Sequence, residues 1–254
     1  MFSVLNDNQI RQYLDRIDLG NCCERGFLYL QQLVRAQLTH VPFENLDIWV
    51  DGSCPCLDTD VLFEKIIVRR RGGYCFELNT LFRVLLNSLG YQAYQCIASL
   101  IHEDRIDPPA HNVIVCRLDG KKYLMDVGFG GPVPFGAIEL REGIFDGFSL
   151  RCEADIWFLE RIDGTKPAFC FRDIPAELRE LEPLNFYISQ KPDSHFRHIL
   201  RCNLRHPDGT VCTLVDDCLQ LRHGDHLRSI TVEDYYSVLQ AYFNMDPHYI
   251  KLKE

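Results

Sequence analysis

The chain has no long hydrophobic run and no excess of positive charge. No stretch of about 18 or more apolar residues occurs, which argues against a transmembrane helix. The start, MFSVLNDNQIRQYL, lacks the basic residues and apolar run of an export signal. Asp and Glu number 36 against 27 Lys and Arg, and the net charge is −9. Proteins that track nucleic-acid phosphates normally carry a basic surface. We therefore expect a cytoplasmic protein with neither a nucleic-acid nor a membrane partner.

Cysteine is abundant, with 12 residues, but its spacing does not indicate a metal site. In a chain without an export signal, free thiols in a reducing compartment are expected. The closest cysteine pairs lack the two-residue spacing of zinc sites, namely Cys22-Cys23 and Cys54-Pro55-Cys56. Two His-x-x-His pairs have no evident third ligand, His195/His198 and His223/His226. The sequence therefore predicts no bound metal.

Hydrophobic periodicity divides the chain into a helical first part, a strand-rich middle and a small mixed end. In the first part, apolar residues recur at helical spacing over residues 9–17, 26–38 and 61–69. The middle predicts strands within residues 91–101, 111–118, 121–129, 148–162 and 167–173, and connecting structure over 185–196. The end predicts further strands within 198–225 and a helix over 231–245. We expect an α+β protein with units at residues 1–90, 91–190 and 191–254.

One stretch, RRRGGYCFELNTLFRVLLNSLG from Arg69 to Gly90, places a cysteine at the start of an amphipathic helix. Cys75 is expected in or near the first turn, where free amides and the helix dipole favour a thiolate. Gly72 and Gly73 would let another backbone or a ligand approach the sulfur. A packed apolar cysteine behind a plain turn explains this stretch equally well.

A hairpin supplies a base and a carboxylate. In HNVIVCRL-DG-KKYLMDVG, a two-residue turn at Asp119-Gly120 makes His111 and Asp126 diagonal neighbours on one face of the sheet. The aspartate would fix the tautomer of the imidazole, whose other nitrogen would act on a thiol. Alone, His111 is more simply a strand histidine, and Asp126 a residue that ends a strand. Together with Cys75 they favour nucleophilic catalysis.

At this point the sequence resembles the arylamine N-acetyltransferase family, in its bacterial form. The matching pieces keep the family's order: PFENLDI at Pro42–Ile48, RRGGYCFELN at Arg70–Asn79, HNVIVC at His111–Cys116 and DVGFGG at Asp126–Gly131. The resemblance is close over about the first 135 residues. It implies a helical bundle, a β-barrel and a small α/β lid around a catalytic core of the papain and transglutaminase type.

The resemblance also implies roles for individual residues. Cys75, His111 and Asp126 would form the catalytic triad, with acetyl-CoA as acetyl donor and an arylamine, arylhydrazine or N-hydroxyarylamine as acceptor. The remaining implied contacts are a supporting ion pair of Arg71 with Glu44, an acceptor contact at Phe43, and CoA contacts at Gly128, Phe129 and Gly130. We expect a monomer or weak homo-oligomer. The same triad would also suit a cysteine hydrolase or a transglutaminase-like acyl transferase.

Overall fold

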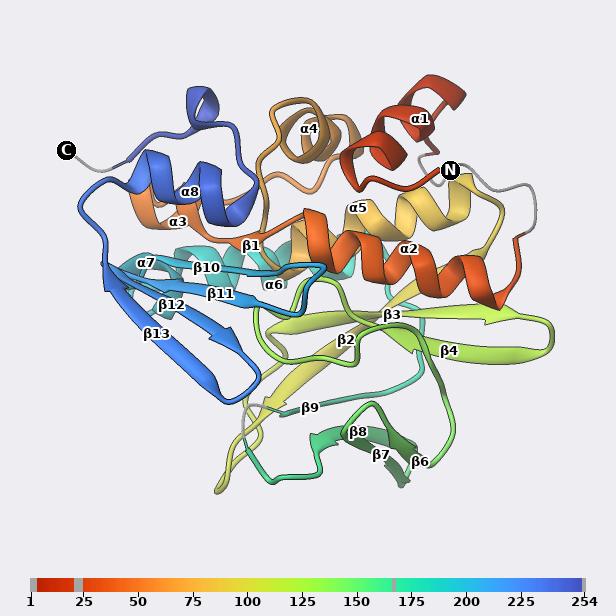
Figure 1. Ribbon diagram of the computed structural model, residues 1–254. Coiled ribbons are helices and arrows are strands. Elements are labelled where there is room, and N and C mark those ends of the chain that lie inside the picture. The colour runs from red at the N-terminus through yellow and green to blue at the C-terminus, as the bar shows by residue number, and fades with distance from the viewer. Residues whose placement is uncertain (1–3, 21–24, 166–167, 253–254) are drawn as a thin grey trace.

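The protein combines helices with two antiparallel sheets in a computed structural model that describes residues 4–20, 25–165 and 168–252. Cys22 and Cys23 lie outside the described residues. The helical segments are α1 Asp7–Arg16, α2 Phe27–His40, α3 Leu46–Asp51, α4 Thr59–Phe63, the π-helix η1 Glu64–Val68, α5 Cys75–Ser88, α6 Leu178–Gln190, α7 His195–His198, α8 Tyr235–Phe243 and the 3-10 turn η2 Pro247–Tyr249. Figure 1 shows α1, α2, α4 and α5 gathered above the strands.

The larger sheet has eight strands in the order β5-β4-β3-β2-β9-β8-β7-β6 and curls, so that β6 to β8 lie below β2 to β4 (Figure 1). Its strands are β2 Gln92–Ile101, β3 His111–Leu118, β4 Lys121–Met125, β5 Ile138–Glu139, β6 Gly143–Phe145, β7 Phe148–Glu153, β8 Ile156–Arg161 and β9 Ala168–Phe171. All the pairings are antiparallel. The sheet therefore forms most of a barrel.

The smaller sheet joins the beginning and the end of the chain. Its order is β1-β10-β11-β12-β13, with β1 Phe43–Glu44, β10 Arg201–Arg205, β11 Val211–Val215, β12 Cys218–His223 and β13 His226–Thr231. The pairing of β1 with β10 sets Phe43 opposite Asn203. One face packs against α8 through buried residues of an apolar cluster, including Cys202, Leu204, Leu239 and Phe243. The other face carries Phe43 and Asn203.

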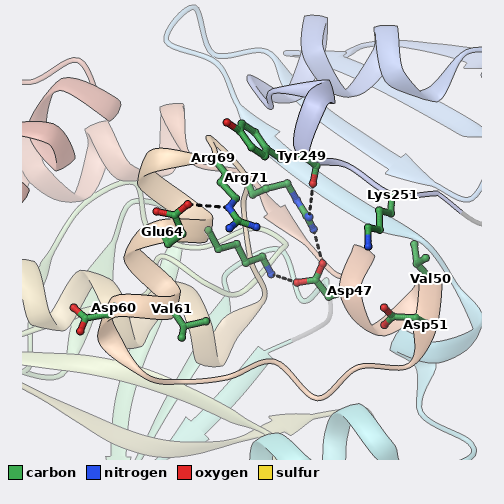
Figure 2. Close-up of a pocket in the computed structure, with 11 residues that line it drawn as sticks. Asp47, Val50, Asp51, Asp60, Val61, Glu64, Arg69, Arg71, Tyr249 and Lys251 are labelled. Carbon is green, nitrogen blue, oxygen red and sulfur yellow. Dashed lines mark hydrogen bonds and ion pairs between the residues drawn. The ribbon is translucent and has the colours of Figure 1, made fainter.

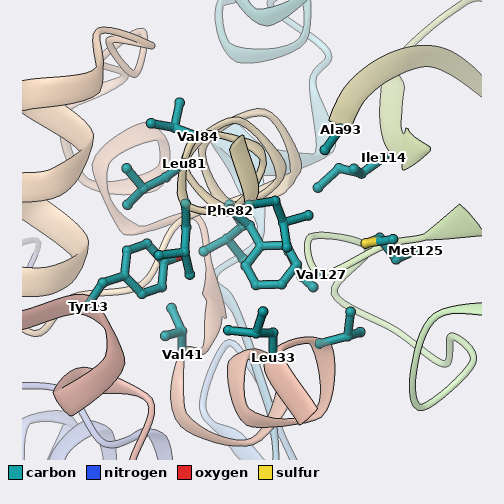
Figure 3. Packing of buried hydrophobic residues seen from close by; sticks show 14 of the residues in the cluster. Tyr13, Leu33, Val41, Leu81, Phe82, Val84, Ala93, Ile114, Met125 and Val127 are labelled. Atoms are coloured by element: carbon teal, nitrogen blue, oxygen red, sulfur yellow. The ribbon is translucent and has the colours of Figure 1, made fainter. Parts of the chain in front are cut away.

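Helix α5 is the centre of the largest hydrophobic cluster and fixes where its first residue lies. Its side chains Leu81, Phe82 and Val84 are fully buried and meet residues from α1, α2, β3 and β4 (Figure 3). Complete burial of one leucine or phenylalanine stabilises a fold by about 1.5–3 kcal/mol. Because the helix is enclosed along its length, Cys75 at its start is held in one position.

The structure departs from the predicted elements in three places. Residues 185–196 were expected to be connecting structure, but α6 covers Leu178–Gln190. Strand β13 occupies His226–Thr231, whereas strands were predicted only as far as residue 225 and the final helix from 231. Helix α1 begins two residues earlier than predicted, because the Asn6 side chain accepts hydrogen bonds from the amides of Asn8 and Gln9. In the described ranges, no helix is both long and apolar enough to cross a membrane.

Candidate active site

Cys75 opens α5 directly after the two glycines, and its exposed fraction is 4%. Gly72 and Gly73 have no side chain, so the backbone of another segment can lie directly against them. A Cβ atom on Gly72 would lie 2.2 Å from the carbonyl oxygen of Pro42, and the amide of Glu44 donates to the carbonyl of Gly73 at 2.9 Å. Of the two predicted uses of this space, the approach of a second chain segment is the one that the structure shows. The glycine pair therefore locks the Pro42–Glu44 segment beside the start of α5.

His111 and Asp126 are joined as the hairpin register predicts. Leu118 pairs with Lys121 across the turn, and His111 Nε2 lies 2.6 Å from Asp126 Oδ2. The two side chains are almost fully buried. With Asp126 ionised, Nε2 carries the proton and Nδ1 presents a lone pair. The Nδ1 atom has no hydrogen-bond partner among the described residues, so it is available to a thiol or an amine.

Asp126 is held by donors on its other oxygen. Asp126 Oδ1 accepts hydrogen bonds from Asn79 Nδ2 at 3.0 Å and from the amide of Gly128 at 2.9 Å. Asn79 also donates to the carbonyl of Asn112 and accepts from the amide of Val127. Asn79 therefore ties α5 to strand β3, which carries His111, and to the segment after β4, which carries Asp126.

Sequence reasoning gave no role to Asn79, although its spacing from Cys75 could have indicated one. Asn79 lies four residues after Cys75 in α5, so both side chains are on one face of the helix. An amide on a buried helix face requires partners, because an unpaired buried polar group costs about 1–3 kcal/mol. The partners of Asn79 are the segments that hold His111 and Asp126.

The loop after Asp126 passes directly over the start of α5. A Cβ atom on Gly128 would lie 2.8 Å from Cys75 Cα, so only glycine fits there. Gly130, with φ +67°, packs against the ring of Phe43, to which an added Cβ would approach within 2.6 Å. The Phe129 ring is 5.2 Å from the His111 ring in an edge-on arrangement. Packing thus accounts for the two glycines, and their contact with CoA stays a prediction.

The electrostatic environment of Cys75 differs from the expectation. Burial, and next the negative charge of Asp126, raise the pKa of the Cys75 thiol well above its usual value. The amides of Phe76 and Cys75 itself act in the opposite direction but do not prevail. The first-turn amides thus favour the thiolate, as expected, but burial outweighs them. A buried thiolate needs a cation beside it, and we expect a protonated His111 to provide one.

Neighbouring residues that contact both Cys75 and Asp126 set the position of Cys75 relative to the His111–Asp126 pair. Gly128 touches the Cys75 backbone and binds Asp126, and Asn79 of the same helix binds the same carboxylate. No hydrogen bond joins Cys75 Sγ to His111 in the part of the chain that the structure describes, so their direct contact stays a prediction.

A buried charge network supports this end of α5. Arg71 donates through Nε and Nη2 to Glu44 Oε1, at 3.1 and 2.8 Å. Its Nη2 also donates to Asp47, as Figure 2 shows. Lys65 Nζ lies 2.7 Å from both Asp47 Oδ2 and Glu77 Oε1. Glu77 in turn accepts from the amide of Tyr74 at 3.1 Å. Arg71 and Glu44 thus form an ion pair, and sequence reasoning missed Lys65, Asp47 and Glu77.

Burial and neighbouring charges shift the pKa values of Glu77 and Lys65 in this network. Burial raises the pKa of Glu77 to about 7, although Lys65 acts against this. Burial would lower the pKa of Lys65, but Glu77, Glu44 and Asp47 together raise it. A cavity of about 600 Å³ borders the network at Arg71, Asp47 and Tyr249. Cys75, His111 and Asp126 do not line it, so this cavity is separate from the catalytic groups.

A curled sheet packed against a helical layer, with a cysteine at a helix start and a hydrogen-bonded His-Asp pair, is the arrangement expected of enzymes that use a cysteine nucleophile. The family model described as N-acetyltransferase matches residues 28–250. An arylamine N-acetyltransferase / N-hydroxyarylamine O-acetyltransferase of Salmonella typhimurium is 30% identical over 250 residues, which cover 91% of this chain and 88% of the relative.

Solved structures agree with this match. An arylamine N-acetyltransferase from Salmonella typhimurium has a TM-score of 0.88 at 27% identity, covering 96% of this chain and 92% of the other. The Mycobacterium marinum arylamine N-acetyltransferase in complex with CoA has a TM-score of 0.85 at 26% identity, with 93% and 92% covered. This chain belongs to the arylamine N-acetyltransferase family, and the predicted fold class is confirmed.

Proposed function

We propose that this protein transfers the acetyl group of acetyl-CoA, through a thioester on Cys75, to the nitrogen of arylamines or arylhydrazines or to the oxygen of N-hydroxyarylamines. The observation that carries the proposal is the 2.6 Å hydrogen bond between His111 Nε2 and Asp126 Oδ2, in a segment that touches the Cys75 backbone. The relatives described above support the reaction class, and the CoA complex of a structural neighbour supports the donor.

In the first half-reaction, the Cys75 thiol passes its proton to His111 Nδ1, and the sulfur attacks the acetyl carbon of the thioester. The bond from that carbon to the CoA sulfur breaks, and His111 returns the proton to the CoA thiolate. Asp126 keeps the proton on Nε2 and stabilises the imidazolium, while remaining ionised itself. The first-turn amides of α5, including that of Cys75, are the donors we assign to the oxyanion.

In the second half-reaction, the amine nitrogen attacks the acetyl-cysteine carbonyl. His111 accepts a proton from that nitrogen, the carbon–sulfur bond breaks, and Cys75 leaves as the thiolate paired with the imidazolium. Amide formation makes this step favourable. Since no water is needed in either half, the surrounding aromatic rings of Phe129 and Phe169 suit the site by limiting hydration.

The remaining assignments rest on position. We assign Phe43, which is buried against Gly130 and Phe196, to the acceptor side of the site. The Gly128 to Gly130 loop is assigned to the CoA side. Arg71 and Glu44 support the Pro42–Glu44 segment and do not contact the reacting atoms. The catalytic groups all come from one chain, and the ten described cysteines are free thiols. Both facts fit a monomeric or weakly associating enzyme of the cytoplasm.

The test is the release of CoA from acetyl-CoA with and without an arylhydrazine. Release that depends on the arylhydrazine, together with formation of the acetylated hydrazide, is the expected result. Equal release in the absence of amine would identify a cysteine hydrolase instead. A lysine peptide that replaces the arylhydrazine as the better acceptor would identify a transglutaminase-like enzyme. Cys75→Ala is expected to abolish turnover in each case.

A further inference from the structure

Two arginines lie over one aromatic ring in the loop that follows Asp126. Arg205 of β10 places its guanidinium carbon 3.9 Å from the ring centre of Phe135, and Arg35 of α2 places its own 5.7 Å from the same centre. Arg35 Nε also donates to the carbonyl of Phe135 at 3.0 Å. Helix α2, strand β10 and the loop that follows Asp126 therefore meet at a cationic cluster, defined here as Arg35, Phe135 and Arg205.

The cluster has no internal counter-charge. The Nε atom of Arg205 is buried without a hydrogen-bond partner. Among the described residues, no carboxylate lies within 4.0 Å of either guanidinium. The neighbouring Asp146 is engaged by the backbone amide of Phe135. Two guanidinium groups over one ring, in a chain of net charge −9, therefore form a local positive centre that would attract an anion.

The loop that carries Phe135 is fixed to α2 by a second pair of contacts. Gln31 Nε2 donates to the carbonyl of Ala137 at 2.7 Å, and the amide of Ala137 donates to Gln31 Oε1 at 2.9 Å. The cluster is therefore built from positioned groups, since its ring and one guanidinium are anchored through backbone hydrogen bonds. Such preorganisation lowers the entropic cost of binding.

A continuous series of contacts links the cluster to the catalytic groups. Gly128 touches Cys75, Gly130 touches Phe43, and Phe43 pairs with Asn203 in the small sheet. Arg205 lies two residues after Asn203 in β10, so its side chain is on the same face. That face is the one opposite α8. An extended substrate with its reacting end at Cys75 can thus follow the loop toward the cluster.

We propose that Arg35 and Arg205 bind phosphate groups of acetyl-CoA, the substrate that the proposed function requires. A guanidinium presents a planar fork of donors that matches phosphate oxygens, and a stacked guanidinium is held ready to do so. The thioester of acetyl-CoA is separated from its phosphates by a long flexible arm, which suits a phosphate site at a distance from Cys75. The cluster determines donor specificity and takes no part in bond making.

Steady-state kinetics of Arg205→Gln and Arg35→Gln test this assignment, with three substrate arms. With acetyl-CoA and an arylhydrazine, kcat/KM for acetyl-CoA is expected to fall about tenfold to a hundredfold in each variant. In a ping-pong reaction, kcat/KM for the arylhydrazine is expected to stay within twofold of wild type. With p-nitrophenyl acetate as donor, which has no phosphate, acetylation of the enzyme is expected to be unchanged, and this also shows that the variants fold.

The matched control is Arg228→Gln. Arg228 lies in β13 opposite Leu221, on the α8 side of the same sheet. Its substitution should leave the kinetics with acetyl-CoA, the arylhydrazine and p-nitrophenyl acetate unchanged. An equal loss with both donors would overturn the proposal, as would an unchanged kcat/KM for acetyl-CoA. If kcat/KM falls for 4-aminobenzoate as acceptor but not for aniline, which has no carboxylate, the cluster binds the carboxylate of the acceptor instead. Failure of the wild type to use acetyl-CoA at all would reject the proposed function, independently of the cluster.

Discussion

Gly128 lies against Cys75 so closely that a Cβ atom at this glycine would be 2.8 Å from Cys75 Cα and 2.9 Å from the Cys75 carbonyl oxygen. Neither atom can give way easily, because both belong to the backbone of a buried helix start. We expect Gly128→Ala to displace the nucleophile relative to His111 and to lower kcat/KM about a hundredfold, as misplacements near 1 Å can do. Gly26→Ala is the control, since a Cβ atom there meets nothing within 4 Å. Equal activity in the two variants would contradict this.

Asp126→Asn should leave the fold in place and remove most of the activity. Oδ1 can still accept from Asn79 and Gly128, but the amide nitrogen would face His111 Nε2 and donate to it. The imidazole would then carry its proton on Nδ1, where it cannot accept one from a thiol. A loss of about 10⁴-fold in kcat has been typical of this change in a related triad.

The control for Asp126→Asn is a second histidine–aspartate pair, in a surface loop. His102 Nε2 binds Asp107 Oδ2 at 2.8 Å in a partly exposed loop, so Asp107→Asn makes the same chemical change away from the site. Rates of alkylation of Cys75 by iodoacetamide across pH provide the second measurement. The Asp126 variant is expected to need a higher pH than wild type, because losing the imidazolium that pairs with the thiolate outweighs removing the negative charge of Asp126. The Asp107 variant should follow the wild-type curve. A wild-type curve from the Asp126 variant would reject the role of the pair.

Arg71→Ala is expected to destabilise the protein by about 3–5 kcal/mol, because the buried carboxylate of Glu44 loses its hydrogen-bonded cation and keeps only Lys65 Nζ, at 3.8 Å. The side chain of Glu44 has 0% exposure. The measurement is the free energy of unfolding in urea. Arg69→Ala removes an ion pair with Glu64 whose partners are about half exposed, and should cost less than about 1 kcal/mol. Similar losses in both variants would contradict the structural role assigned to Arg71.

The stability of the buried network should depend on Glu77 and on pH. The pKa of Glu77 is about 7 in the folded chain and 4.5 in its ordinary state. Between those values the folded chain holds more protons than the unfolded chain, so this group lowers the free energy of unfolding as pH rises. We expect the difference in unfolding free energy between wild type and Glu77→Gln to fall by about 2 kcal/mol from about pH 5 to pH 7.

The control for this pH dependence is Glu64→Gln, which alters an exposed carboxylate of the neighbouring η1 segment. Its difference from wild type should stay constant over the same range. A constant difference for Glu77→Gln as well would show that the buried carboxylate titrates normally.

The site was predictable wherever local geometry determines it. The turn at Asp119-Gly120, with φ values of +49° and +74°, sets the hairpin register, and the register alone brings His111 to Asp126. By contrast, the contacts of Arg71 with Asp47 and of Gly128 with Cys75 depend on how distant segments pack. No period or motif in the sequence specifies such distances, which is why Lys65, Asp47 and the Arg35–Arg205 cluster were not predicted.

The two missed elements have different causes. In α6 the buried positions Leu181, Asn185 and Ser189 recur at helical spacing, but two of them are polar, so the hydrophobic pattern is hidden. Pro183 inside the helix also indicates a break. Strand β13 is an edge strand with almost all of its side chains exposed, so it shows no alternation of apolar and polar residues. In both cases the backbone pairing or packing prevails over local preference.

The central claim is that Cys75 carries the acetyl group between donor and acceptor. Mass spectrometry of the intact protein after mixing with acetyl-CoA, followed by peptide mapping, tests it most directly. We predict one added acetyl group, located on Cys75, lost on addition of an arylhydrazine and absent in Cys75→Ala. An acetyl group on the exposed thiols of Cys54 or Cys56, or on no cysteine while the amine is still acetylated, would contradict the account.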